Sequence, residues 1–336
     1  MCTISQRLPA ASVTSLVLLA MLVLGPATST SATFPGANGK IAFVRSTETG
    51  TSDVWVMDPD GRNQRQLTWT GLAGSPTWSA DGTKIAFTQR ASADGASDVW
   101  VMNADGSGKR RVTTNAASES GPTWSPDGRW LAFASDRTGR GEIYRIRSTR
   151  PYGRPVRLTF TEPPTSEGDF LWNGAPTWSP DGRRIAFSQV YGNDMYYGND
   201  FVALGLMRAD GSRLRVTAMG TEADRLVYAS GPNWGPGGAF LAWTHNKDYY
   251  EDPPTNVYRS AVGSTTGIEV THYADWEADR ISGPSWSPSY GTQIVYSAEV
   301  GGTYRPAIYR IASNGTGVPA LIARNAEAPD WGVATG

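Results

Sequence analysis

Two histidines and a scatter of carboxylates are the residues in this sequence that acid–base or metal chemistry would need. His245 and His272 are the only histidines among the 336 residues, and two imidazoles are a small donor set for a transition metal. Six acids in the long loops could supply the carboxylate pair of a glycosidase: Glu162, Glu167, Asp169, Asp194, Asp248 and Asp275. No spacing singles out one pair, so the sequence predicts neither a catalytic residue nor a metal site.

Nucleophilic catalysis also lacks its usual residues. The single cysteine is Cys2, and the sequence contains no Gly-x-Ser-x-Gly elbow. The segment 191–200 (YGNDMYYGND) carries oxygen ligands that calcium could use, but its spacing fits no calcium loop, so we predict no cofactor. The sequence therefore favours a binding protein over an enzyme.

Aromatic side chains beside Asp and Asn in the long loops indicate a binding surface. Tyr and Trp offer large contact areas to proteins, and ring faces beside carboxylates and amides also suit sugars. The alternative is that a ring such as Trp172 only fixes its loop to the body of the protein. The candidate ligand-binding residues are Trp172, Tyr191, Asp194, Tyr196, Tyr197, Asp200, His245, Tyr249, Tyr250, His272, Asp275 and Trp276.

These loops interrupt a repeat that occupies most of the chain. PTWSADGTKIAF (76–87) returns as PTWSPDGRWLAF (122–133) and PTWSPDGRRIAF (176–187), with looser copies at 232–243 and 284–296. A strand such as DVWVM and a short strand such as RQLT, RRVT or LRVT follow each copy. Four short strands joined by Asp-Gly turns, repeated every 45 to 56 residues, predict the blades of a β-propeller. We expect the aspartates of the SPDG segments to be turn residues.

The repeat PTWSPDGxxIAF followed by DVWVMNADG resembles that of the TolB-like β-propeller family, over about residues 34–333. The resemblance implies a protein-binding platform of the bacterial envelope, and its motif builds blades rather than sites. TolB itself carries an α/β domain before its propeller. Only about thirty residues precede the first repeat here, so we expect a propeller alone.

The last residues of the chain are expected to close the ring. The first unit lacks a PxW strand, and APDWG (328–332) supplies one after the last unit. Placing it beside residues 40–44 gives an all-β fold of six four-stranded antiparallel blades and covers two exposed strand edges. Short turns then share one face. The long loops, with the candidate ligand-binding residues, share the other.

The N-terminus predicts export. Arg7 precedes the apolar run 16–25, and small residues at 27–32 offer a cleavage site. We expect a signal peptide over residues 1–32, a propeller domain over residues 33–336, and a Sec-type route to the periplasm, the cell wall or the medium. An uncleaved membrane anchor is the alternative. After cleavage the chain would contain no cysteine and no membrane segment.

The charge pattern limits the class of partner. The net charge is -1, and no basic stripe of the kind that neutralises phosphates is visible in the sequence, which argues against nucleic acid. The expected partner of this monomer is an unidentified envelope or extracellular protein, or a glycan. A glycan-active lyase or hydrolase remains the enzymatic alternative.

Overall fold

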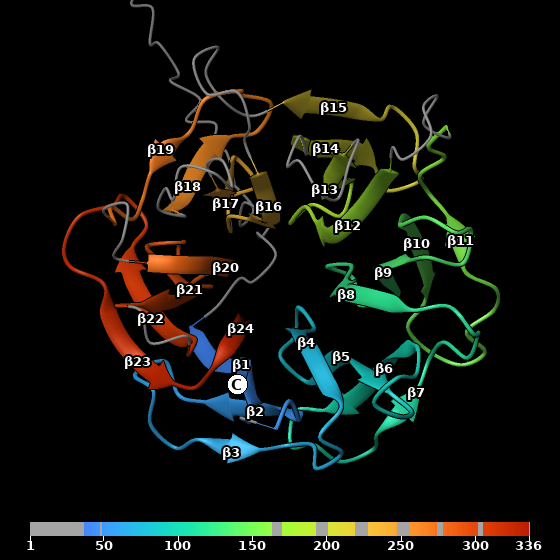
Figure 1. Ribbon diagram of the computed structural model, residues 1–336, viewed down its shortest axis with the longest axis horizontal. Coiled ribbons are helices and arrows are strands. Elements are labelled where there is room, and N and C mark those ends of the chain that lie inside the picture. Colours follow the sequence, from blue (N-terminus) through green and yellow to red (C-terminus); the bar gives the residue numbers. More distant parts are fainter. Residues whose placement is uncertain are drawn as a thin grey trace, which may run out of the picture.

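The chain folds into a ring of β-strands. The computed structural model describes residues 37–47, 49–162, 170–192, 201–218, 228–246, 256–273, 278–301 and 305–335. Within these ranges there are 24 strands and no helix, and the strands form six four-stranded antiparallel blades around a central axis (Figure 1). No helical segment there has the length and apolar character of a membrane crossing. The predicted six-bladed propeller is confirmed.

The strands form four concentric layers, and the inner two layers carry the repeated PxW and IAF motifs. The innermost strands of blades 1 to 6 are β24 (Glu327–Val333), β4 (Ala73–Trp78), β8 (Glu119–Trp124), β12 (Phe170–Trp178), β16 (Tyr228–Trp234) and β20 (Ala278–Trp286). The second strands, in the same order, are β1 (Asn38–Ser46), β5 (Lys84–Arg90), β9 (Trp130–Ser135), β13 (Arg184–Gly192), β17 (Phe240–Asn246) and β21 (Gln293–Val300).

The outer two layers complete each blade. The third strands are β2 (Ser52–Met57), β6 (Ser97–Asn103), β10 (Glu142–Arg147), β14 (Phe201–Arg208), β18 (Asn256–Ala261) and β22 (Ala307–Ala312). The outermost strands are β3 (Arg65–Gln66), β7 (Arg110–Arg111), β11 (Val156–Arg157), β15 (Arg215–Ala218), β19 (Ile268–Glu269) and β23 (Ala320–Arg324). One parallel bridge, between Val202 and Tyr228, also joins blades 4 and 5.

Blade 1 is assembled from both ends of the described chain, as the sequence predicts. In β24, Trp331 pairs with Ile41 and Asp330 pairs with Ala42 of β1. The Trp331 side chain is fully buried, and its Nε1 donates a hydrogen bond to Gly39 O at 3.2 Å. Figure 1 shows β24 on the inner side of β1, between β20 and β4.

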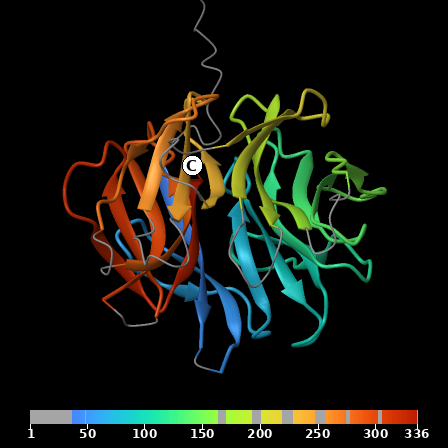
Figure 2. The same cartoon turned by 45° about the horizontal axis from the view of Figure 1, so that its top comes forward.

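The connections divide the ring into two faces, which the tilted view of Figure 2 helps to separate. Short turns join the first strand to the second and the third to the fourth, so both turns of a blade lie on one face, the short-turn face. The connections from second to third strand and the crossovers between blades lie on the opposite, loop-rich face. Glycines such as Gly82, Gly128 and Gly182 hold φ near +67° in the first turns, a conformation that glycine adopts without a steric cost.

Every innermost strand bends at the residue before its proline. These residues are small and have φ between +46° and +62°: Ser75, Gly121, Ala175, Gly231, Gly283 and Ala328. The strand register shifts at the same place, as in a β-bulge. A Cβ atom on Gly121 would lie 3.4 Å from Ala175 Cα, so the backbones of neighbouring blades nearly touch there and leave room only for small side chains.

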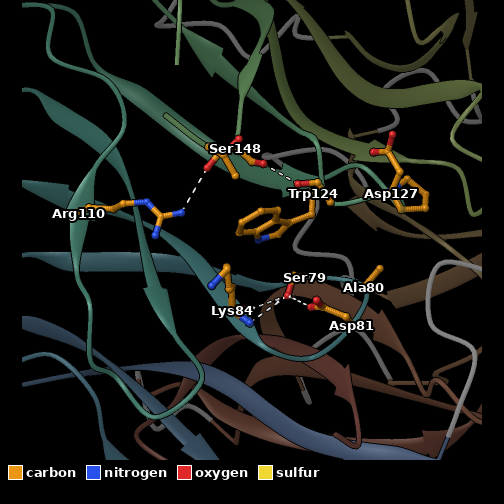
Figure 3. A pocket seen from close by; sticks show the side chains of 11 residues that line it. Ser79, Ala80, Asp81, Lys84, Arg110, Trp124, Asp127 and Ser148 are labelled. Atoms are coloured by element: carbon orange, nitrogen blue, oxygen red, sulfur yellow. Dashed lines mark hydrogen bonds between the residues drawn. The ribbon is translucent and has the colours of Figure 1, made fainter. Parts of the chain in front are cut away.

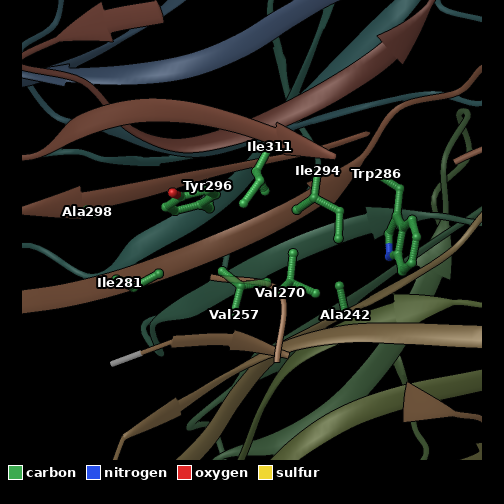
Figure 4. Close-up of a cluster of buried hydrophobic side chains, with 9 residues drawn as sticks. All are labelled: Ala242, Val257, Val270, Ile281, Trp286, Ile294, Tyr296, Ala298 and Ile311. Carbon is green, nitrogen blue, oxygen red and sulfur yellow. The ribbon is translucent and has the colours of Figure 1, made fainter. Parts of the chain in front are cut away.

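The core lies between successive blades. Figure 4 shows the cluster between blades 5 and 6, where Val257 and Val270 face Ile294 and Tyr296. The repeated tryptophan ties some blades to their neighbours. Trp234 Nε1 donates to Thr177 O of blade 4, and Trp286 Nε1 donates to Asn233 O of blade 5, both at 3.1 Å. The repeat thus encodes contacts between blades as well as the strands within them.

Candidate functional site

The predicted ligand-binding residues are divided between described and undescribed parts of the chain. Trp172 lies in β12, Tyr191 in β13 and His245 in β17, while His272 follows β19; the side chains of Trp172 and His272 are described. The other eight lie outside the described residues: Asp194, Tyr196, Tyr197, Asp200, Tyr249, Tyr250, Asp275 and Trp276. The grouping of all twelve into one site stays a prediction.

Trp172 lies on the loop-rich side of blade 4 and contacts blade 3. A Cβ atom added to Gly141 of blade 3 would be only 2.3 Å from Cδ2 of the Trp172 ring. Gly141 therefore permits the ring to lie directly on its backbone. The side chain remains 37% exposed. This residue both fixes the start of β12 to the neighbouring blade and presents ring surface to solvent.

The His272 side chain is exposed and interacts only weakly with its acidic neighbour Glu269. Its Nδ1 lies 3.9 Å from Glu269 Oε1, and such a surface pair contributes little to stability. Nowhere in the described ranges are three or more His, Cys, Asp or Glu side chains arranged to hold a metal ion. The side chain of His245, the other histidine, lies outside the described part of the structure.

Several acids are used to fasten the outermost strands. In blade 1, Asp53 accepts hydrogen bonds from Thr68 Oγ1 at 2.7 Å and Thr70 N at 3.0 Å. Thr68 Oγ1 in turn accepts one from Val54 N at 2.9 Å. We call this arrangement the threonine clasp. It recurs as Asp98–Thr113 in blade 2, Glu142–Thr159 in blade 3 and Asn256–Thr271 in blade 5.

The threonine clasp gives these acids a structural role. Asp98 and Glu142 are also paired with Arg111 and Arg157 of the outermost strands. A buried carboxylate with such partners is fully occupied by hydrogen bonds and is a poor candidate for catalysis. The sequence carried a signal for the clasp, because acid or amide and threonine are 15 residues apart in blades 1, 2 and 5.

The aspartates of the first turns are also structural. Asp81, Asp127 and Asp181 each accept a hydrogen bond from the serine hydroxyl two residues earlier, at 2.6 Å. Each also accepts one from the backbone N–H two residues later, at 3.0 Å. The prediction that these aspartates shape turns is confirmed.

One carboxylate lies among the innermost strands. Asp330 in β24 accepts hydrogen bonds from Trp78 N of blade 2 at 2.7 Å and from Ser285 Oγ of blade 6 at 3.2 Å. Burial raises the pKa of Asp330 to about 6, and these two hydrogen bonds oppose the rise. The adjoining cavity has a volume of about 20 Å³, which is room for about one water molecule. Asp330 therefore helps to close the ring at a place too small for a substrate.

A small hollow lies between blades 2 and 3 on the short-turn face (Figure 3). Its volume is about 140 Å³, and Figure 3 shows the ring of Trp124 in its middle, with Arg110 to the left of the ring and Lys84 below it. Trp124 Nε1 is buried and has no hydrogen-bond partner among the described residues. Arg110 donates to Ser148 O at 3.3 Å, and Lys84 donates to Asn103 Oδ1 at 3.3 Å. A hollow of this size has room for a few water molecules or a small anion.

A longer hollow runs between blades 3 and 4 on the same face. Its inner part, about 290 Å³, borders Trp178 and the turn aspartates Asp127 and Asp181. Its outer part, about 790 Å³, adjoins the inner part at Arg145 and Asp181. We call the outer part the arginine groove after the six arginines that border it: Arg145, Arg183, Arg184, Arg208, Arg213 and Arg215. No motif in the sequence predicts this groove, whose residues come from blades 3 and 4.

Comparison with known proteins agrees with the architecture. Residues 18–170 match the family model described as the TolB β-propeller domain. The repeats are TolB-like. The match covers a little under half of the chain, and the resemblance stated from the repeats is confirmed. No curated protein matches the sequence.

Solved structures show the same TolB-like ring. TolB from Acinetobacter baumannii superposes with a TM-score of 0.65 at 17% identity, covering 88% of this chain and 67% of that one. Hydrazine synthase from Kuenenia stuttgartiensis gives 0.66 at 15% identity, covering 92% and 50%. An oligogalacturonate lyase in complex with manganese gives 0.52 at 14% identity, covering 87% and 85%. Identities this low show a shared fold alone, and the chain spans only half of the hydrazine synthase chain.

Proposed function

We propose that this TolB-like propeller is an exported, non-catalytic binding protein whose loop-rich face holds a protein partner. The family resemblance supports a binding or scaffold role. Export rests on the predicted signal peptide over residues 1–32, which lies outside the described residues. The periplasm, the cell wall and the medium remain the compartments that this route would reach.

One observation carries the proposal: large aromatic side chains are exposed on the crossovers between blades. Trp69 follows β3 and is 70% exposed, Phe160 follows β11 and is 71% exposed, and Trp172 in β12 is 37% exposed. Exposed rings of this size dominate the binding energy of protein interfaces. The propeller that carries these aromatic side chains is held by regular strand pairing, so its backbone loses little freedom when a partner binds.

A glycan is the second candidate ligand. The same ring faces would stack on sugar rings, and the neighbouring amides and hydroxyls would bond the sugar hydroxyls. The fold likeness to an oligogalacturonate lyase is compatible with this candidate. A glycan ligand would not require catalysis.

The experiment compares wild type with Phe160→Ala and Trp172→Ala. The exported form would be immobilised and used to capture proteins from the envelope and secreted fractions of the producing cells. We expect both variants to lose the captured partner. Tyr290→Ala is the matched control, since Tyr290 is 94% exposed in a turn on the opposite face.

The same proteins would be applied to a glycan array. Glycan binding that Trp172→Ala abolishes, with no captured protein, would replace the protein partner by a glycan. A partner that both loop-face variants retain would contradict the proposed face.

A further inference from the structure

The outer edge of blade 4 departs from the repeat. In blades 1, 2, 3 and 5 the aliphatic residue before the clasp threonine is buried: Leu67, Val112, Leu158 and Val270. Its counterpart in blade 4, Val216, is 43% exposed. The acid of the threonine clasp is replaced by Ala203, and β15 continues as a regular strand from Arg215 to Ala218. A shift of one residue reverses the two sides of a strand, which explains the exposure.

Blade 4 also carries a like-charged pair where blade 1 carries a compensated one. Arg184 of β13 lies opposite Arg208 of β14. At the same position of blade 1, Lys40 Nζ contacts Asp58 Oδ1 at 2.6 Å. Like charges directly across a strand pair destabilise a sheet. The positive charges of Arg184 and Arg208 therefore do not stabilise the fold of blade 4.

The acids within the arginine groove are committed to their turns. Burial would raise the pKa of Asp181, but hydrogen bonds from Ser179 and the Arg183 N–H outweigh it and lower the pKa. Hydrogen bonds from the side chain and N–H of Ser212 lower the pKa of Asp210. Both carboxylates are ionised at neutral pH, but six arginines against two acids leave the groove strongly positive.

Four of the six arginines are available to a ligand. No side-chain hydrogen bond or ion pair joins Arg183, Arg208, Arg213 or Arg215 to any described residue, and all four are exposed. The other two are held in place by aromatic rings. The guanidinium of Arg145 lies 4.8 Å from the Trp130 ring centroid and that of Arg184 lies 5.0 Å from the Trp234 ring centroid.

The charge of the chain is unevenly distributed around the ring. Residues 119–218, which form blades 3 and 4, contain 13 Lys and Arg against 11 Asp and Glu, whereas residues 219–336 contain 7 against 12. Blades 3 and 4 therefore carry a small positive net charge in a chain whose net charge is -1. Such a patch attracts anionic partners over roughly a Debye length, about 8 Å at physiological salt.

We propose that the arginine groove and the neighbouring outer edge of β15 bind an acidic, partly aliphatic segment of another protein. Guanidinium groups match carboxylates in planar, two-point geometry, which fits glutamate or aspartate side chains. Leu214 and Val216 are 39% and 43% exposed beside the groove, and they would contact the aliphatic residues of the segment. An acidic glycan fits less well, because the ring faces of Trp130 and Trp234 are already covered by arginines. This site is separate from the loop-rich face of the proposed function.

The test uses synthetic peptides of eight residues that combine two or three glutamates with leucine and valine at every spacing. Binding to the intact exported chain would be followed by fluorescence anisotropy at low and high salt. We expect at least one peptide to bind, and Arg208→Gln with Arg213→Gln to weaken it about tenfold or more through loss of two charged contacts. Val216→Thr should weaken the same peptide about threefold without changing its dependence on salt.

Two matched controls are available on the same chain. Arg62→Gln with Arg129→Gln removes the same charge from side chains of the short-turn face that are 83% and 82% exposed, and should leave binding unchanged. Val318→Thr, at a side chain that is 90% exposed in blade 6, is the control for Val216→Thr. An equal loss with the Arg62 and Arg129 control would show non-specific attraction and overturn the proposal.

Three further outcomes would also overturn it: no peptide binds, polyglutamate binds as tightly as the best mixed peptide, or oligogalacturonate displaces that peptide at lower concentration. None of these bears on the loop-rich face, whose variants Phe160→Ala and Trp172→Ala should bind the peptide normally. Failure here and failure of the proposed function are therefore distinguishable.

Discussion

Blades 1 and 4 are built from the same repeat and differ in how their outer parts are held. In blade 1 the outermost strand is fixed by Asp53 and Thr68, Leu67 is buried, and Lys40 is neutralised. In blade 4, Ala203 replaces the acid of the threonine clasp, and Val216 is exposed. Their inner strands do not differ in this way, since the buried Ile41 and Phe43 of blade 1 correspond to the buried Ile185 and Phe187 of blade 4.

The difference shows that the repeat separates two tasks. The PxW and IAF strands supply the same buried core residues in both blades, whereas the outermost strand decides what the rim exposes. Blade 4 can lose its clasp and accumulate arginines because neither change reaches its two inner strands. Variants that exchange features between the two blades should therefore separate effects on stability from effects on binding.

The largest effect is expected from removing the strand that closes blade 1. Deleting residues 328–336 removes the buried Trp331 and leaves β1 without its inner neighbour. We expect the cooperative thermal transition to be lost, because the cavity left by a buried tryptophan alone costs about 3–5 kcal/mol. Deleting only residues 335–336 is the control. A truncated chain that melts like wild type would contradict the closure.

The second effect concerns Asp330, whose place in blade 4 is taken by the neutral Thr177. The pKa of Asp330 is about 6 in the folded protein, above its ordinary value of 3.8, so the folded state binds this proton more tightly than the unfolded state. Its contribution to stability is full below pH 4 and is lost as the pH rises through 6. By this shift, Asp330→Asn should gain up to about 3 kcal/mol over wild type at pH 7.5 and nothing near pH 4.

Urea denaturation of wild type and Asp330→Asn between pH 4 and pH 8 measures this difference. Other carboxylates titrate in both proteins and cancel in the comparison. Thr177→Val, the matched change in blade 4, should shift the free energy of unfolding by the same amount at every pH. A difference between wild type and Asp330→Asn that does not vary with pH would contradict a raised pKa.

The third effect tests the threonine clasp. Asp53→Ala leaves Thr68 Oγ1 and Thr70 N without their acceptor and should lower the free energy of unfolding by about 2 kcal/mol. Asp94→Ala, at an exposed position of blade 2, should change it by less than about 0.5 kcal/mol. Since blade 4 folds with Ala203 at this place, equal stability of Asp53→Ala and wild type would mean that the clasp is dispensable everywhere.

The smallest effect is expected from exchanging the charged pairs of blades 1 and 4. Arg208→Asp gives blade 4 the cation–carboxylate pair of blade 1 and should raise the free energy of unfolding by about 0.5 kcal/mol. Asp58→Arg should lower it, because the hydrogen bonds from Lys40 and Asn63 are lost. Arg208→Asp should at the same time abolish binding of the acidic peptide. Retained binding would show that Arg208 does not contact the ligand.

The six-bladed ring could be predicted from the sequence, because the same motifs recur from blade to blade. Five copies of the PxW motif and a sixth in APDWG specify the innermost strands, and the missing first copy predicts that β24 pairs with β1. The Asp-Gly turns were predictable for the same reason. Each of these features depends on residues close together in the chain or on the count of repeats.

The rim of blade 4 could not be predicted in the same way. LRVT reads like RRVT of blade 2, yet Val216 is exposed where Val112 is buried, because the register depends on a clasp partner that lies well before it in the chain. The arginine groove was missed since its residues come from two blades and several turns, which only folding brings together. For the long loops, eight of the twelve predicted residues lie outside the described ranges.

The composite blade also fixes the order in which the molecule can be assembled. The pairing of Ala42 with Asp330 joins segments nearly three hundred residues apart, so it is among the most non-local contacts in the fold and is expected to form slowly. During synthesis the chain can build five blades as an open arc while β1 to β3 wait for an inner strand. Until β24 arrives, the inner edge of β1 has no partner, and the apolar sides of blades 1 and 6 that cluster with Trp331 are exposed. The interval between making the fifth complete blade and closing the ring is when this protein is most exposed to aggregation.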